Sequence, residues 1–251
     1  MKKLVSLVLA LFLLGALWAC GEENAVLEKA KTYEVSAGIH TLDIRIGAAD
    51  FTIRHGTGFS VESDLQYLSV TEKDGVLTIV DEAPRGVTYK GPTFVLTIPA
   101  DSVFKSISIS TGAAKLTSAA LAAESVKLLL GAGAVRIDSL QASDAASIQG
   151  GAGEITISAG QMQDLTLEMG VGELNMTAAL LGNSRLVLGV GESNVTLLGA
   201  KDDYKVDLKK GLGSITVDGK KVSDFGSSGS GENHIKIEGG VGAVNLRFDE
   251  E

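Results

Sequence analysis

Three twelve-residue stretches decide the fold of this chain: VKLLLGAGAVRI (126–137), LTLEMGVGELNM (165–176) and IKIEGGVGAVNL (235–246). Each joins two runs of alternating apolar and polar residues through a glycine-rich centre. An apolar side chain at every second position is typical of a β-strand that is buried on one face. The stretches therefore predict pairs of strands joined by a tight bend at the glycines.

The same unit recurs along most of the chain. Successive leading glycines from Gly112 onward are separated by 19, 20, 19, 19, 22 and 29 residues. One unit cannot bury its apolar face alone, whereas stacked units share a continuous core. Parallel crossovers favour one hand, so we expect an all-β, single-stranded right-handed parallel β-helix with coils over residues 101–251. The leading glycines are Gly47, Gly112, Gly131, Gly151, Gly170, Gly189, Gly211 and Gly240.

The two ends of the repeat region differ from its middle. Residues 34–100 hold one repeat copy and further strand runs, with a hairpin signal at Asp74-Gly75. They predict a β-rich N-terminal cap that includes the first repeat. Near the other end, GSSGSG (226–231) has the composition of a flexible loop between the last two coils. We expect the acidic terminus, 248–251, to end the stack, where its charges would discourage edge-to-edge pairing.

The N-terminus has the three parts of a secretion signal. Lys2 and Lys3 precede an apolar run, which is too short to span a bilayer comfortably. The sequence Leu-Trp-Ala-Cys-Gly (17–21) resembles the cleavage box of bacterial lipoproteins, in which the cysteine carries the lipid. We expect a lipoprotein signal peptide over 1–19, lipidation of Cys20 and a tether over 20–33. An ordinary secretory signal or an anchoring helix is the alternative.

The charge balance bears on location and partners. The chain has 22 Lys and Arg against 31 Asp and Glu; loss of Lys2 and Lys3 with the leader leaves 20 against 31, a net charge of −11. An acidic surface without a basic stripe argues against a nucleic-acid partner. We expect a protein of the bacterial cell envelope, held outside the cytoplasm by its N-terminal lipid.

One column of the repeat could carry chemistry. Glu154, Glu173 and Glu192 each lie three residues after a leading glycine, so stacking would align them about 4.8 Å apart. Facing like charges repel, and two interpretations follow. Either the carboxylates bind Ca²⁺ with hard oxygen ligands, or they point into water on a solvated outer face, which is the simpler reading. A hydroxyl and amide column runs beside them: Thr156, Asn175, Asn194, Thr216 and Asn245.

Catalytic and cofactor-binding residues are not predicted. A phosphate-binding Gly-x-Gly turn must open a helix, but here β-type alternation follows each time. His40, His55 and His234 share no zinc-ligand spacing. Coils of 19 or 20 residues leave little chain for the loops of a catalytic cleft. We therefore expect no enzyme. A β-helical polysaccharide-active enzyme that uses the three glutamates is kept as an alternative.

Several of these segments resemble one group of families. The lipoprotein-type leader, LDIRIGAADFTI (42–53), TFVLTIPADSVFKSISISTGAAKLT (93–117) and the later Gly-x-Gly coils are similar to the toast-rack and auto-transporter adhesin-head families of bacterial envelope proteins. The resemblance covers roughly residues 34–248. It implies a β-helical body at the cell envelope, supplies no catalytic motif, and includes relatives linked to antibiotic or envelope-stress responses.

These observations favour a non-catalytic, adhesin-like binding or scaffold module. Its expected partners are the membrane, through the lipid, and an envelope protein or glycan ligand. A sensor or regulatory partner in the envelope-stress or antibiotic response is a further alternative, which the resemblance implies.

Overall fold

A computed structural model describes residues 23–24, 27–222 and 225–250. Within these residues the protein is all-β: strands are joined by loops and by one short 3₁₀ turn, Lys201–Asp203. No helix in the described part of the chain is long and apolar enough to cross a bilayer. The predicted signal peptide (1–19) and the lipidation site Cys20 lie outside the described residues.

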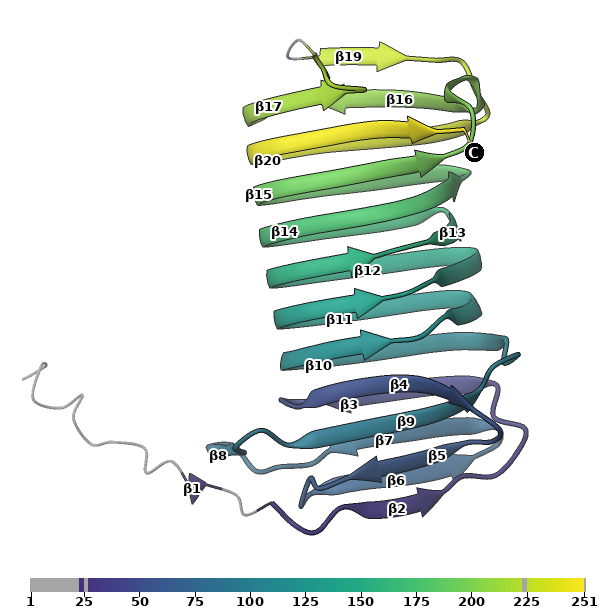
Figure 1. The fold of residues 1–251 in the computed structure, drawn as a ribbon, viewed down its shortest axis with the longest axis vertical. Helices are drawn as coiled ribbons and strands as arrows, with labels where there is room; N and C mark the ends of the chain where they lie inside the picture. Colours follow the sequence, from purple (N-terminus) through teal and green to yellow (C-terminus); the bar gives the residue numbers. More distant parts are fainter. Residues whose placement is uncertain (1–22, 25–26, 223–224, 251) are drawn as a thin grey trace, which may run out of the picture.

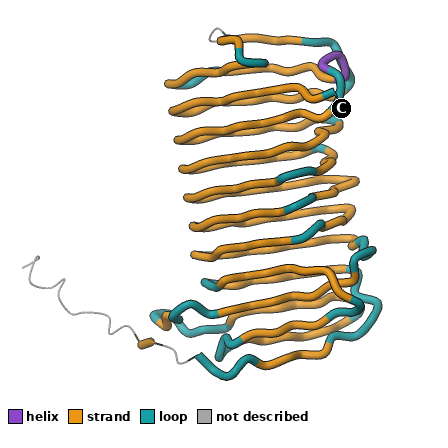
Figure 2. The backbone as a smooth tube through the Cα atoms, in the orientation of Figure 1, coloured by secondary structure: helices purple, strands orange, loops and turns teal. Residues whose placement is uncertain are grey.

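The centre of the molecule is a stack of long parallel strands (Figures 1 and 2). Each strand bends at its leading glycine and turns back, so one strand with its return forms one coil. Leu128, Ile148, Leu167 and Leu186 stand opposite one another in neighbouring strands. The strands are β10 (Phe104–Ser118), β11 (Leu121–Ile137), β12 (Leu140–Ile157), β14 (Leu165–Leu181) and β15 (Asn183–Leu198), with the short β13 (Gly160–Gln163) beside β12 and β14.

Aliphatic columns fill the interior of the stack. The position three residues before each leading glycine is fully buried in seven coils and 5% exposed at Leu208. Polar residues alternate with these positions along each strand and face outward. The 19- or 20-residue period therefore places like side chains on top of one another, and burial of these apolar columns is the main source of stability. The seven buried residues are Ile44, Ile109, Leu128, Ile148, Leu167, Leu186 and Ile237.

The copy around Gly47 forms the first coil. Its two arms, β3 (Thr41–Ile46) and β4 (Asp50–Gly56), pair in parallel with the two arms of β10. Phe51 in β4 packs edge-to-face against Phe94 in the next layer, with ring centroids 4.6 Å apart. The core thus continues without a break from the coils into the N-terminal region.

Shorter strands close the N-terminal end at the bottom of Figure 1. Two of them continue the parallel stack, and three pair antiparallel and cover the edge. Part of the segment expected as a tether forms the outermost strand, β2. The parallel strands are β7 (Val76–Asp81) and β9 (Thr93–Pro99); the antiparallel ones are β2 (Lys31–Glu34), β5 (Ser60–Ser63) and β6 (Leu68–Lys73); β1 (Glu23–Asn24) pairs separately with β8 (Val87–Thr88).

The C-terminal strand is inserted into the stack, which corrects the expectation that the terminus ends it. β20 (Asn233–Asp249) pairs in parallel with β15 on one side and with β16 (Tyr204–Lys209) and β17 (Leu212–Val217) on the other. A break separates β16 from β17, whereas β20 is continuous and matches β15 over its whole length. The regular strand therefore takes the interior place, and the interrupted pair lies outside it.

The outer edge at this end is covered by two short antiparallel strands. β18 (Lys220–Lys221) pairs with β17, and β19 (Phe225–Ser228) pairs with β16. The expectation of a flexible loop at 226–231 was therefore wrong for its first half, which lies in β19. Covering an exposed sheet edge in this way prevents end-to-end pairing between molecules.

The second glycine of each bend is fixed by close backbone contact. Gly133, Gly153, Gly172, Gly191 and Gly242 all have φ between +129° and +139°. A Cβ on Gly172 would clash with the backbone of Gly153 in the coil below, and the same holds at the other bends. Ala49 and Ala114 occupy this position in the first two coils, where φ is not positive.

We expect Gly172→Ala to destabilise the protein by about 2 kcal/mol or more, because the variant combines an unfavourable φ with a backbone clash. Gly58→Ala is the matched control: its added Cβ meets open space, and its φ is not positive, so unfolding should change by less than about 0.5 kcal/mol. Urea denaturation followed by circular dichroism measures both. Equal stability of the two variants would contradict the role assigned to the bends.

Candidate functional site

The three candidate glutamates lie in one row on the outer face of the second arm. Glu154 in β12 stands opposite Glu173 in β14, which stands opposite Glu192 in β15. We call these three residues the glutamate row. The side chain of Glu154 is 44% exposed, and Glu173 and Glu192 are exposed as well. The row thus meets solvent and does not line a closed cleft.

Each carboxylate of the row accepts a hydrogen bond from a neutral side chain. Thr156 donates to Glu154 at 3.0 Å, Asn175 to Glu173 at 2.8 Å, and Asn245 to Glu192 at 3.2 Å. Glu154 also lies 3.6 Å from the guanidinium of Arg136. These contacts, together with solvation, offset the repulsion between facing like charges without a bound cation.

A ladder of amides runs beside the row. The Nδ2 atom of Asn194 donates to Oδ1 of Asn175 at 2.9 Å, and the Nδ2 atom of Asn245 donates to Oδ1 of Asn194 at 2.9 Å. Thr216 donates to Asn245 at 2.9 Å. The ladder runs from β17 through the inserted β20 to β14 and ends on Glu173. We call Thr216, Asn245, Asn194 and Asn175 the asparagine ladder.

The described residues contain no group of three or more His, Cys, Asp or Glu arranged to hold a metal ion. Ca²⁺ requires six to eight oxygen ligands around one centre, and the three in-register glutamates do not form a group of that kind. Of the two interpretations of the row, the geometry favours the solvated one.

The opposite outer face carries a mixed-charge cluster. Glu238 lies 3.0 Å from Arg185, 3.2 Å from Lys236 and 3.9 Å from Lys209. Hydrogen bonds from Arg185 and Lys236 lower the pKa of Glu238 below its usual value. Toward the C-terminal end of the stack the two faces therefore differ: one presents the carboxylates and amides around Glu173 and Glu192, and the other presents the paired charges around Glu238.

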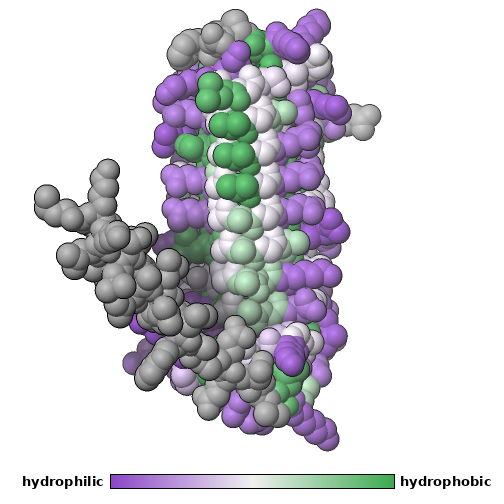
Figure 3. Space-filling model, turned by 90° about the vertical axis from the view of Figure 1, so that its left-hand side faces the viewer, coloured by the Kyte–Doolittle hydropathy of each residue, from purple (hydrophilic) through white to green (hydrophobic). Residues whose placement is uncertain are grey.

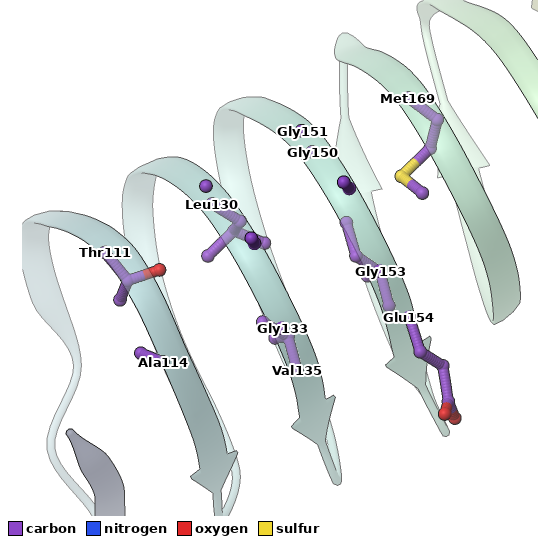
Figure 4. A pocket seen from close by; sticks show the side chains of 14 residues that line it. Thr111, Ala114, Leu130, Gly133, Val135, Gly150, Gly151, Gly153, Glu154 and Met169 are labelled. Carbon is purple, nitrogen blue, oxygen red and sulfur yellow. The ribbon is translucent and has the colours of Figure 1, made fainter. Parts of the chain in front are cut away.

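The bends leave no room for a ligand inside the stack. Figure 4 shows Thr111, Leu130 and Met169 lining successive bends, with Gly150 at the same place in β12. The space that a side chain at Gly150 would fill is taken by Met169 and Ile155. The two cavities that remain at the bends measure about 10 Å³ each, which is room for no more than one water molecule apiece.

A larger hollow of about 410 Å³ lies at the N-terminal end beside Gly47. Tyr89 donates a hydrogen bond to Asp81 there at 3.2 Å. Burial and the neighbouring Asp81 raise the pKa of Tyr89 to about 12, and burial raises the pKa of Asp81 as well. No pattern in the sequence predicts this hollow, because residues 83 to 89, which include β8, close it over the first bend.

These features define a repeat-built β-protein with a filled core and extended polar outer faces. The chain belongs to the Toastrack DUF4097 family, whose model matches residues 60–247. This confirms the family resemblance seen in the sequence. No curated protein matches the chain.

Several solved structures that are similar to the chain are described as adhesins or as a cell adhesion protein. A "putative adhesin" from Parabacteroides distasonis is 15% identical, with 87% of this chain and 97% of that chain covered and a TM-score of 0.50. A "putative adhesin" from Bacteroides fragilis is 15% identical, with 87% and 96% covered and a TM-score of 0.48. A "putative cell adhesion protein" from Clostridium sporogenes is 16% identical, with 88% and 99% covered and a TM-score of 0.37. At these identities the likeness concerns the fold alone.

We expect Ca²⁺ at millimolar concentration to change the melting temperature by no more than Mg²⁺ or NaCl at equal ionic strength, because a native-state ligand must stabilise by mass action and the row offers no converging site. Thermal melts with each salt and with a chelator measure this. A rise specific to Ca²⁺ that disappears in Glu173→Gln would instead establish the row as a cation site.

Proposed function

We propose that this chain is a non-catalytic lipoprotein of the bacterial cell envelope that acts as an adhesin-like binding or scaffold module. The observation that carries the proposal is the outer face formed by the glutamate row and the asparagine ladder. It presents oxygen and amide groups in register over successive coils. Extended faces of this kind are the surfaces that stacked-repeat proteins use to bind partners.

The proposal includes the finer description of the body as a single-stranded right-handed parallel β-helix. Pairing of β10, β11, β12, β14 and β15 along both arms, at a shift of 19 or 20 residues, supports a helical winding of the chain. The preference of parallel crossovers for the right hand supports its sense.

The ligand class follows from the chemistry of this face. Carboxylates and side-chain amides are hydrogen-bonding groups suited to hydroxyl-rich glycans or to the polar and basic surface of an envelope protein. Aromatic residues make up only 5% of the chain, so binding would depend on hydrogen bonds and charge rather than on ring stacking.

Attachment at the membrane is the second part of the proposal. Its support is the leader of Lys2, Lys3 and an apolar run that ends at Cys20, the single cysteine of the chain. A lipid on Cys20 would hold the body close to the bilayer, because Glu23 already pairs with Val87 on the body.

We expect the wild-type chain produced in bacteria to partition into the detergent phase of Triton X-114, and Cys20→Ser to move to the aqueous phase or to retain its uncleaved leader. Trp18→Ala keeps the cysteine and should partition like the wild type. Radiolabelled palmitate incorporation gives a second readout. Unchanged labelling in Cys20→Ser would exclude this residue as the lipid carrier.

We expect a photo-crosslinking amino acid at position 192 to trap a discrete envelope protein or glycan in living cells, whereas the same amino acid at exposed position 124 should not. Glu192→Lys should weaken the interaction at least tenfold, because it reverses a charge within the row, and Glu124→Lys is the matched control. Binding of the purified chain to a glycan array tests the glycan class directly. Equal trapping at both positions would contradict a binding role for this face.

A further inference from the structure

An apolar stripe runs along the edge of the stack where the strands bend. It consists of the residue after each leading glycine, and Figure 3 shows it as a continuous band that becomes more hydrophobic toward the C-terminal end. The four large members are exposed: Val171 by 55%, Val190 by 48%, Val241 by 47% and Leu212 by 83%. We call this band the edge stripe; in spatial order it comprises Ala48, Ala113, Ala132, Ala152, Val171, Val190, Val241 and Leu212.

We propose that the C-terminal half of the edge stripe binds a second copy of this chain in an antiparallel, two-fold symmetric arrangement. The two-fold axis crosses the stripe at right angles, between Val190 and Val241. Val190 of one copy then faces Val241 of the second copy, and Val241 of the first faces Val190 of the second. Val171 then faces Leu212 of the second copy. The four exposed large apolar residues of the stripe are then covered in both copies, which removes the solvent exposure of its most hydrophobic part.

The charges that flank the stripe favour this arrangement. On one flank Glu168 lies two coils from Glu238 and three from Lys209, so the two-fold axis brings Glu168 opposite Lys209 of the second copy. On the same flank Val187 meets Glu238, whose carboxylate is already held by Arg185 and Lys236.

The other flank carries the glutamate row. In the proposed dimer the glutamate row of one copy does not face the glutamate row of the second copy. Glu192 faces Ala243 of the second copy, and Glu173 faces Ser214. Both glutamates therefore meet small neutral residues. The flank places no like charges opposite each other within the four overlapping coils.

Two other symmetric pairings are disfavoured by charge. A two-fold axis parallel to the stripe would place Glu168 opposite Glu173. An antiparallel overlap along the whole stripe would place Glu154 opposite Glu173 and Arg45 opposite Lys209. Repulsion between like charges disfavours these two arrangements relative to the proposed one, in which only the four C-terminal coils overlap. Specific interfaces commonly exclude wrong pairings in this way.

The inserted position of β20 creates this complementarity. If the coils were stacked in chain order, the same axis would bring Glu168 opposite Glu238 instead of Lys209, and two carboxylates would meet. The interface is small: four coils span about 20 Å, which places it among weak, transient contacts.

Sedimentation of the full chain in detergent, with Cys20→Ser in every sample, tests the proposal independently of the lipid anchor. We expect a reversible dimer, and we expect Val190→Asp to weaken it at least tenfold. Val103→Asp is the matched control, because Val103 is 72% exposed and lies off the stripe; it should dimerise normally. Both variants should melt like the parent. A parent that remains monomeric at millimolar concentration would overturn the proposal.

Orientation is tested by disulfide trapping and charge exchange. Mixing Val171→Cys chains with Leu212→Cys chains should give a mixed crosslinked dimer, whereas Val171→Cys alone should give none; the reverse result would overturn the antiparallel arrangement. Lys209→Glu should weaken the dimer, and the double variant Glu168→Lys with Lys209→Glu should restore it. Failure of the double variant to recover would reject the assigned charge pair.

Discussion

The contact on which the rest of the structure depends is the approach of one coil's backbone to the next at the bend. Gly153, Gly172 and Gly191 lie so close over one another that a Cβ on any of them would strike the carbonyl group below. This fixes the vertical spacing and allows no slip along the strand. A one-residue slip would turn every buried leucine outward, so the register of the core is set both by the glycines and by the aliphatic columns.

A fixed register turns each column of the repeat into a ladder with one chemical character. Aliphatic columns become the core, with Leu167 over Ile148 fully buried. The column of Asn175 and Asn194 becomes a chain of amide hydrogen bonds. The same rule that stacks leucines also stacks glutamates, and the neighbouring amides relieve that cost. The polar outer faces are thus by-products of the constraint that forms the core.

Sequence reasoning could predict what depends on periodicity, namely the strand type, the buried columns and the alignment of Glu154 with Glu173. The neighbours of each coil could not be predicted, because every coil presents nearly the same edge and the period does not say which edge is used. β20 lies inside because it is continuous, whereas a break separates β16 from β17. The effect of that break on the strand order depends on how well each strand pairs with β15 in the folded protein. The direction of the amide ladder and the hollow beside Asp81 depend on that same tertiary context.

The inserted strand β20 affects both ways in which such a stack could self-associate, end to end through strand edges and side by side through the edge stripe. β16 and β17 form an outer coil, and β20, the last strand in the sequence, lies inside it between β15 and the pair of β16 and β17. The end of the stack is then covered by β18 and β19, which blocks end-to-end addition through exposed strand edges. Insertion also places Val241 between Val190 and Leu212 and brings Lys209 to the outer coil. One topological feature therefore covers the edge of the last coil and completes the apolar edge along its side, which is why the proposed association is lateral and not axial.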